Sequence, residues 1–112
     1  MIDRGSVVLV DLDSTRGHEQ RGSRPYVVVS SSAVNAAQRY PMMAVVPLTG
    51  TEGSGALYPM LRPGPSGIQK PSWALVDQIR TIDKRRISRV FGMVAPQELA
   101  AVEEGLVLFL GL

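Results

Sequence analysis

The sequence predicts a small β-barrel with one helix packed on it, and three observations support this fold class. The chain of 112 residues contains many short runs of strand-forming residues, irregular turns between them, and one amphipathic segment near its end. Hydrophobic residues make up 45% of the chain but aromatic residues only 5%, which favours a core of aliphatic side chains. Because a chain of this length leaves room for one core, residues 1–112 are expected to form a single domain.

Local patterns predict where the strands lie. Runs rich in β-branched and other strand-forming residues occur at 7–10, 26–29, 42–48, 56–62, 73–82 and 86–94. Residues 30–37 are small and polar and are expected to form a short helical turn, and residues 63–71 form a connection rich in proline and glycine. Because proline cannot donate to a ladder, Pro47 predicts that the third strand either is an edge strand or ends there, and Thr49 is expected to close it.

A single amphipathic helix is expected to end the chain. Pro96 suits the first turn of a helix, and Glu98 favours the positive end of the helix dipole. The apolar residues that repeat at spacings of three and four are Leu99, Val102, Leu106 and Phe109.

The composition excludes several kinds of site. Cysteine is absent, which excludes disulfides, thiolate metal sites and a cysteine nucleophile. His18 is the single histidine, so a ribonuclease that works with two histidines is excluded. The carboxylates without a recognisable metal-ligand spacing are Asp11, Asp13, Glu19 and Glu52. Asp11 and Asp13 could still bind a hard cation, but such residues more often cap strands and turns.

The sequence has no segment typical of a secretion signal or a membrane span. Asp3, Arg4 and Asp11 interrupt the first apolar run, and the longest apolar run, near residues 106–112, is too short to cross a bilayer. We therefore expect a cytoplasmic protein with no membrane contact.

Positive charge is concentrated in two places, although the formal net charge is only +2. The first basic cluster comprises Arg16, Arg21 and Arg24, and the second comprises Arg80, Lys84, Arg85, Arg86 and Arg89. If folding brings the two clusters together, they can bind a polyanion such as a nucleic acid. A solvated basic surface without a ligand is the alternative interpretation.

Residues suited to chemistry gather in the loop at 13–23 and at the end of the third strand. The polar residues in and beside this loop are His18, Glu19, Gln20, Arg21 and Arg24. RNA can be cleaved by attack of its own 2′-hydroxyl if the charge that builds on the phosphate is stabilised. A guanidinium and a hydroxyl, such as those of Arg24 and Thr49, can do this without a metal. The same residues also fit a surface arginine paired with Glu19 and an ordinary turn threonine.

Four further segments carry a family resemblance when they are taken together. They are Arg4-Gly5-Ser6-Val7 leading to Val10-Asp11-Leu12-Asp13, Gly17-His18-Glu19-Gln20-Arg21-Gly22-Ser23-Arg24-Pro25, Val46-Pro47-Leu48-Thr49, and Asp77-Gln78-Ile79-Arg80-Thr81-Ile82-Asp83-Lys84. With these segments in this order, the chain resembles the MazF/PemK family of toxin endoribonucleases. One departure is Ser14, where many members have proline, and it bears on base preference.

The resemblance implies an SH3-like barrel of the MazF/PemK/CcdB type with a C-terminal helix and short helical turns, assembled as a homodimer. It implies the toxin of a type II toxin–antitoxin system, which cleaves single-stranded mRNA at specific sequences and inhibits translation and growth under stress. The ends produced would be a 2′,3′-cyclic phosphate and a 5′-hydroxyl. No metal or other cofactor is implied, and the expected partner is a MazE-like antitoxin with a disordered acidic tail. The leucines near residues 106–112 also fit a dimer, with a monomer that has a frayed end as the alternative.

The resemblance also assigns site residues. The implied catalytic residues are Arg24, from the Arg-Pro pair, and Thr49, with Glu19 as the next candidate. The residues expected to contact RNA are Arg16, His18, Gln20, Arg21, Asn35, Gln78 and Arg80, although ordinary loop polarity explains the amides equally well. Two alternatives are a gyrase-poisoning toxin of the same fold and a barrel that binds RNA without cutting it. The gyrase toxins act through an aromatic residue at the end of the C-terminal helix, and this chain has no tryptophan there.

Overall fold

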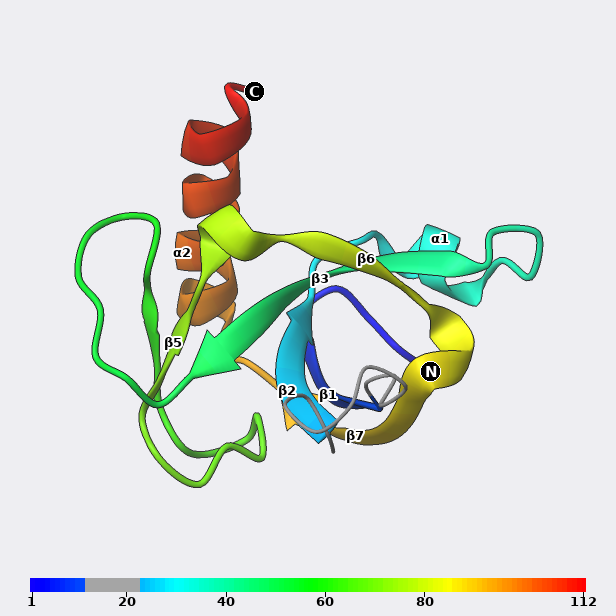
Figure 1. The fold of residues 1–112 in the computed structure, drawn as a ribbon, viewed down its shortest axis with the longest axis horizontal. Helices are drawn as coiled ribbons and strands as arrows, with labels where there is room; N and C mark the ends of the chain where they lie inside the picture. Colours follow the sequence, from blue (N-terminus) through cyan, green and yellow to red (C-terminus); the bar gives the residue numbers. More distant parts are fainter. Residues whose placement is uncertain (12–22) are drawn as a thin grey trace, which may run out of the picture.

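The structure, a computed structural model, describes residues 1–11 and 23–112 as a curled antiparallel sheet with a helix at the C-terminus (Figure 1). The strands are β1 (Ser6–Asp11), β2 (Ser23–Val28), β3 (Met42–Thr49), β4 (Met60–Leu61), β5 (Ser72–Ala74), β6 (Arg80–Asp83) and β7 (Ile87–Met93). The helices are α1 (Ser32–Ala36) and α2 (Pro96–Leu110), with the 3-10 turns η1 (Val76–Gln78) and η2 (Lys84–Arg86). The predicted mainly β fold with a C-terminal helix and short helical turns is confirmed.

Strand β3 is central to the sheet. The strand order is β4-β5-β3-β2-β1-β7, every pair is antiparallel, and β6 also pairs with β3. One edge of β3 carries β2, while the other carries β6 along residues 42–45 and β5 along residues 48–49. The chain must therefore turn a corner between β5 and β6.

Both faces of the sheet are buried, which explains the nearly continuous apolar runs in the sequence. On one face, the helix-side cluster packs Val27, Val46 and Leu48 with Val102 and Leu106 of α2. On the other face, the barrel-side cluster consists of Val8, Val10, Tyr26, Val28, Met43, Val45 and Ile82. Alternate residues of one strand enter different clusters, so the sheet divides the single core expected from the chain length into two.

Two of the strands expected from the sequence are shortened or interrupted. Of residues 56–62, only Met60–Leu61 is a strand, because the chain turns where the Tyr58 N–H donates to the Gly55 carbonyl at 3.0 Å. The run at 73–82 is interrupted by η1, which separates β5 from β6. The interruption is needed because β5 and β6 pair with different ends of β3 along the same edge. Strand propensity does not reveal such a corner, because the partner strand decides it.

Pro47 lies inside the central strand, which corrects the prediction of an edge or a strand end. It pairs with Tyr26 of β2, and its carbonyl accepts from the Leu75 N–H at 2.9 Å. The N–H and C=O positions of one strand residue point to the same edge. The nitrogen of Pro47, which carries no hydrogen, therefore faces the edge of β3 that β5 and β6 share. It lies in the gap between these two strands, so no ladder bond is lost. Thr49 is the last residue of β3, as predicted.

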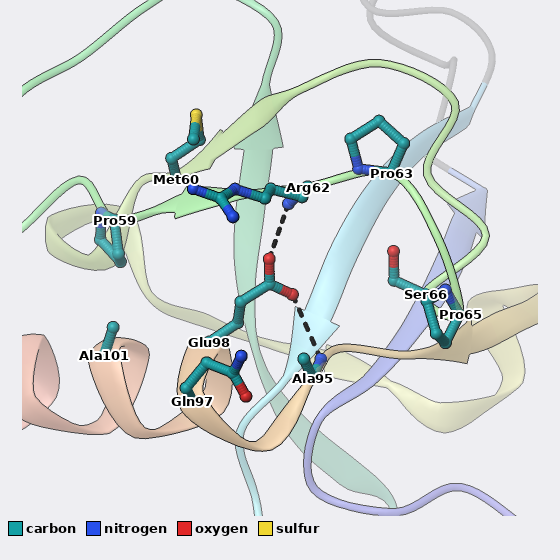
Figure 2. A pocket seen from close by; sticks show the side chains of 10 residues that line it. All are labelled: Pro59, Met60, Arg62, Pro63, Pro65, Ser66, Ala95, Gln97, Glu98 and Ala101. Atoms are coloured by element: carbon teal, nitrogen blue, oxygen red, sulfur yellow. Dashed lines mark hydrogen bonds between the residues drawn. The ribbon is translucent and has the colours of Figure 1, made fainter.

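Helix α2 begins at the residue that the sequence indicates. Pro96 is its first residue, and the Glu98 carboxylate accepts from the Ala95 N–H at 3.2 Å and from the Arg62 N–H at 2.7 Å (Figure 2). The second bond ties the helix to the segment after β4. The helix ends at Leu110, and Gly111 caps it with a φ of 73°, which suits a residue without a side chain.

The end of α2 projects beyond the sheet (Figure 1). Its exposed apolar residues are Val107, Leu108, Phe109, Leu110 and Leu112. Phe109 is 44% exposed, so it does not join Val102 and Leu106 on the packed face as its spacing suggests. Within the described ranges, no helix is both long enough and apolar enough to cross a membrane.

Candidate active site

Arg24 and Thr49 lie at the same end of neighbouring strands. The last pair of the β2–β3 ladder is Tyr26 with Pro47. Arg24 precedes Tyr26 by two residues, and Thr49 follows Pro47 by two in the antiparallel strand. If this register is continued by two residues along each strand, Arg24 and Thr49 lie opposite each other.

The two residues also share a face of the sheet. Side chains alternate between faces along a strand, and Tyr26 and Val45 belong to the barrel-side cluster. Arg24 and Thr49 have the same parity as these residues, whereas their neighbour Leu48 enters the helix-side cluster. Both residues are half-buried. Register and alternation thus place a guanidinium and a hydroxyl from distant parts of the chain at the same end of the barrel-side face.

The hydroxyl of Thr49 remains able to donate. Its Oγ1 accepts a hydrogen bond from the Thr51 N–H at 3.1 Å, which fixes the start of the loop after β3. This bond uses a lone pair of the oxygen and leaves the hydroxyl hydrogen for another acceptor. Arg24 is held by the β1–β2 ladder, where it pairs with Val10.

A hydrogen bond that the sequence analysis missed fixes the loop beyond Thr49. The Tyr58 hydroxyl donates to Asp77 Oδ2 at 2.7 Å, and this bond to the carboxylate raises the pKa of Tyr58. Asp77 Oδ1 is buried and has no partner among the described residues. The bond connects the loop at 50–59 to η1. Asp77 belongs to a recognised motif segment, but nothing in the sequence indicates that Tyr58 would be its partner.

Gln78 and Arg80 are exposed, as an RNA contact requires. Gln78 ends η1, directly after Asp77, and Arg80 begins β6 opposite Val45. Both therefore lie on the corner that follows β5, the strand paired with Thr49.

Asn35 is engaged inside the protein. It is 9% exposed, its Oδ1 accepts from the Ser30 hydroxyl at 2.6 Å, and its Nδ2 donates to the carbonyls of Ile2 at 3.2 Å and Ser30 at 3.1 Å. These bonds connect α1 to the N-terminal segment. The structure therefore gives Asn35 a role within the protein rather than on an RNA-binding surface.

The remaining predicted site residues lie outside the described part of the chain. They are Arg16, His18, Glu19, Gln20 and Arg21, in the segment 12–22 between β1 and β2.

The second basic cluster is partly engaged with the protein itself. The Lys84 ammonium donates to the carbonyls of Val34 at 2.7 Å and Ala37 at 2.9 Å, where it caps the end of α1. Arg85 forms two side-chain hydrogen bonds with Asp83 and holds the pKa of that carboxyl down at about 2. Arg86 Nη1 lies 3.5 Å from the Asp11 carbonyl, at the end of β1. One end of this cluster thus reaches the strand that leads to the first cluster.

Two pockets lie on the helix side of the sheet. One of about 400 Å³ lies between the start of α2 and the segment after β4 (Figure 2). Another of about 360 Å³ is lined by Pro25 and Leu48. Their chain neighbours Arg24 and Thr49 point to the opposite face of the sheet and do not line this pocket. Among the described residues, no group of three or more His, Cys, Asp and Glu could hold a metal ion.

The fold corresponds to that of a known class of bacterial toxins. A family model described as PemK-like, MazF-like toxin of type II toxin–antitoxin system matches residues 3–110, so the chain belongs to this family. The chain is 37% identical to Endoribonuclease MazF9 of Mycobacterium tuberculosis, over 100% of this chain and 98% of that protein.

Solved structures agree with this membership. A MazE–MazF complex from Deinococcus radiodurans superposes with a TM-score of 0.81 at 28% identity, covering 98% of this chain and 96% of that one. An endoribonuclease in complex with its cognate antitoxin from a mycobacterial species has a TM-score of 0.81 at 25% identity, covering 100% of this chain and 97% of that one. The similarity to these proteins therefore extends over the whole fold.

Proposed function

We propose that this chain is the endoribonuclease toxin of a type II toxin–antitoxin pair and that it cleaves single-stranded mRNA. The observation that carries the proposal is its family membership over nearly the whole chain, together with an arginine at the start of β2 and a threonine at the end of β3, which the strand register places on one face. The relative at 37% identity is named an endoribonuclease, which supports the same activity here. Because mRNA is translated in the cytoplasm, a cytoplasmic site of action goes with this substrate.

The proposed chemistry needs only the RNA and side chains of the protein. The 2′-oxygen attacks the adjacent phosphorus, the bond from phosphorus to the 5′-oxygen breaks, and the products are a 2′,3′-cyclic phosphate and a 5′-hydroxyl. One proton leaves the 2′-hydroxyl and one reaches the departing 5′-oxygen. A guanidinium stays charged in proteins, so we assign Arg24 to the negative charge that develops on the phosphate.

Thr49 and Glu19 complete the proposed reaction. The Thr49 hydroxyl, which retains its hydrogen for a further acceptor, donates to a phosphate oxygen. Glu19, in the Glu-Gln pair of the family motif, is the candidate for proton transfer. The proposed RNA contacts are Arg16, His18, Gln20, Arg21, Gln78 and Arg80.

The partners follow from the same proposal. Relatives are described in complex with a cognate antitoxin or with MazE, so a MazE-like antitoxin is the proposed inhibitor of this chain. A homodimer is proposed as the active form, and the exposed apolar end of α2 provides surface for such an interface.

Cleavage of a long RNA of mixed sequence, in the presence of EDTA, tests the proposal. We expect cuts at a limited set of sequences, with cyclic phosphate and 5′-hydroxyl ends. Arg24→Ala and Thr49→Ala should each lower the rate by about a hundredfold or more while the fold remains intact. The matched controls are Arg62→Ala and Thr51→Ala, which remove an exposed arginine and an exposed threonine and should cut normally.

Two outcomes would overturn the proposal. Unchanged cutting by both site variants would remove Arg24 and Thr49 from the reaction. Inhibition of DNA supercoiling by gyrase, without any RNA cleavage, would favour the gyrase-poisoning class of toxins with this fold.

A further inference from the structure

We propose that Trp73 is a stacking residue for an RNA base beside Thr49, and that it sets part of the base preference of the enzyme. The inference rests on the proposed function, because it takes Thr49 as the position of the reacting phosphate. It concerns a side chain that belongs to neither hydrophobic cluster and has no part in the proposed chemistry.

Strand register places Trp73 next to Thr49. Thr49 of β3 pairs directly with Trp73 of β5, and Trp73 pairs with Met60 of β4. Directly opposed residues have their side chains on one face, with Cβ atoms about 4.5–5.5 Å apart. A row across four adjacent strands therefore consists of Arg24, Thr49, Trp73 and Met60. The place of Arg24 opposite Thr49 in this row comes from continuing the β2–β3 register.

The row lies on the face away from α2. The residues of the alternate parity, Leu48, Ala74 and Leu61, all enter the helix-side cluster. Figure 2 shows Met60 directed away from α2, in agreement with this assignment. At this end of β3 the barrel-side cluster has ended, because β6 leaves β3 at Val45. The face is therefore open, and Met60 is 40% exposed.

Trp73 lies outside the hydrophobic core. It is half-buried and is absent from both hydrophobic clusters and from the partly buried residues packed against them. Its indole N–H donates to no other residue in the described part of the chain. A tryptophan beside a buried strand normally packs into the core or hydrogen-bonds through its nitrogen. This one offers a ring and a free donor at the edge of the candidate site.

A base of single-stranded RNA is the occupant that fits this position. Bases of single-stranded RNA are recognised by stacking on aromatic side chains, and polar groups on the base edge supply selectivity. Neighbouring strands lie about 4.8 Å apart, so a base attached to a nucleotide whose phosphate lies at Thr49 comes within reach of the ring. Met60 extends the apolar floor, and the indole N–H provides one donor for a base acceptor.

The first test uses the fact that the chain contains a single tryptophan, so that its fluorescence reports on Trp73 alone. The probe is an oligonucleotide that carries a mapped cleavage site with a 2′-O-methyl group at the attacking position, which prevents cutting. We expect saturable quenching with the same midpoint as binding followed by anisotropy of a labelled oligonucleotide. Saturable binding without any change in tryptophan fluorescence would overturn the inference.

The second test separates stacking from folding. Trp73→Ala should weaken binding by about fivefold to a hundredfold, the usual effect of removing one aromatic–base stack, and Trp73→Phe should restore most of it. KM should rise while kcat at saturating RNA changes little, and the preference at one base near the cut should relax. The matched control is Tyr40→Ala, which removes an exposed aromatic residue before the other end of β3 and should leave binding unchanged.

The outcomes distinguish this inference from the proposed function. If the wild-type protein cuts RNA and Thr49→Ala does not, but Trp73→Ala binds and cuts with unchanged KM and preference, then the stacking role is wrong and the nuclease assignment stands. If the wild-type protein cuts no RNA in the same assay, the proposed function fails. Should Trp73→Ala not fold, Trp73→Phe and the fluorescence titration decide the question.

Discussion

The two ends of β3 differ in how completely they are enclosed. At Val45 the strand pairs with β2 on one edge and with β6 on the other, and the side chain is fully buried. At Thr49 the observed pairing is with β5 alone, and the side chain is only half-buried. One continuous strand of eight residues thus supplies core at its closed end and candidate chemistry at its open end. The difference shows how a small barrel can keep a polar side chain partly accessible without giving up its core.

The open end is nevertheless held in place. The Tyr58–Asp77 hydrogen bond fixes the loop after β3, and the Thr51 N–H fixes the hydroxyl of Thr49. A site that acts by positioning needs this rigidity, because small displacements of reacting groups cost large factors in rate. Stability and access are therefore separated along the strand.

The largest expected effect is a loss of stability at the closed end. Ile82→Ala removes a residue that is 3% exposed in the barrel-side cluster, and the free energy of unfolding should fall by about 2–5 kcal/mol. Met60→Ala, at the open end, should change it by no more than about 0.5 kcal/mol. Urea unfolding of both variants measures the contrast, and equal losses would mean that the two ends are equally enclosed.

A smaller effect, on activity, is expected from the loop at the open end. Tyr58→Phe keeps the ring but removes the hydrogen bond to Asp77, and RNA cleavage should fall by about tenfold as the loop at 50–59 loosens. Tyr40→Phe, near the closed end, should cleave normally. The pKa of Tyr58 is raised above 10.0, so the hydroxyl remains a donor, and the contribution of this bond to stability is lost only as the pH rises through that higher value. Normal cleavage by Tyr58→Phe would show that the bond does not position the site.

The smallest effect concerns Asp83 at the closed end. Its hydrogen bonds from Arg85 lower the carboxyl pKa from 3.8 to about 2. A lowered pKa stabilises the folded state above the ordinary value, and this contribution is lost as the pH falls towards about 2. An NMR titration of the Asp83 carboxyl carbon should give that midpoint, and Arg85→Ala should return it towards 3.8. Because Arg85 is 90% exposed, the change in overall stability should be slight.

Local patterns in the sequence were sufficient for most of the elements. β-branched runs located β1, β2, β3 and β7, and Pro96 with Glu98 located the start of α2. Where prediction failed, the cause was a partner distant in sequence. The break between β5 and β6 exists because both strands share one edge of β3, and Pro47 is tolerated because that edge has a gap beside it.

The candidate site divides in the same way. The family motifs are sufficient to point to Arg24 and Thr49. The inward position of Asn35 is visible only in the structure, because it depends on hydrogen bonds to Ser30 and Ile2. The Tyr58–Asp77 pair and the position of Trp73 beside Thr49 had no local signal, because neither residue type nor spacing encodes which strands become neighbours.

The sequence by itself determined the class of fold, the family and the chemistry-bearing residue types, since these depend on periodicity and on motifs that are local in the chain. Only the tertiary structure decided which of those residues meet and which face they share. Strand register makes that decision, and register is set by long-range pairing and by burial on both sides of the sheet. A shift of one residue in β5 would turn Trp73 to the opposite face and leave the composition of the chain unchanged.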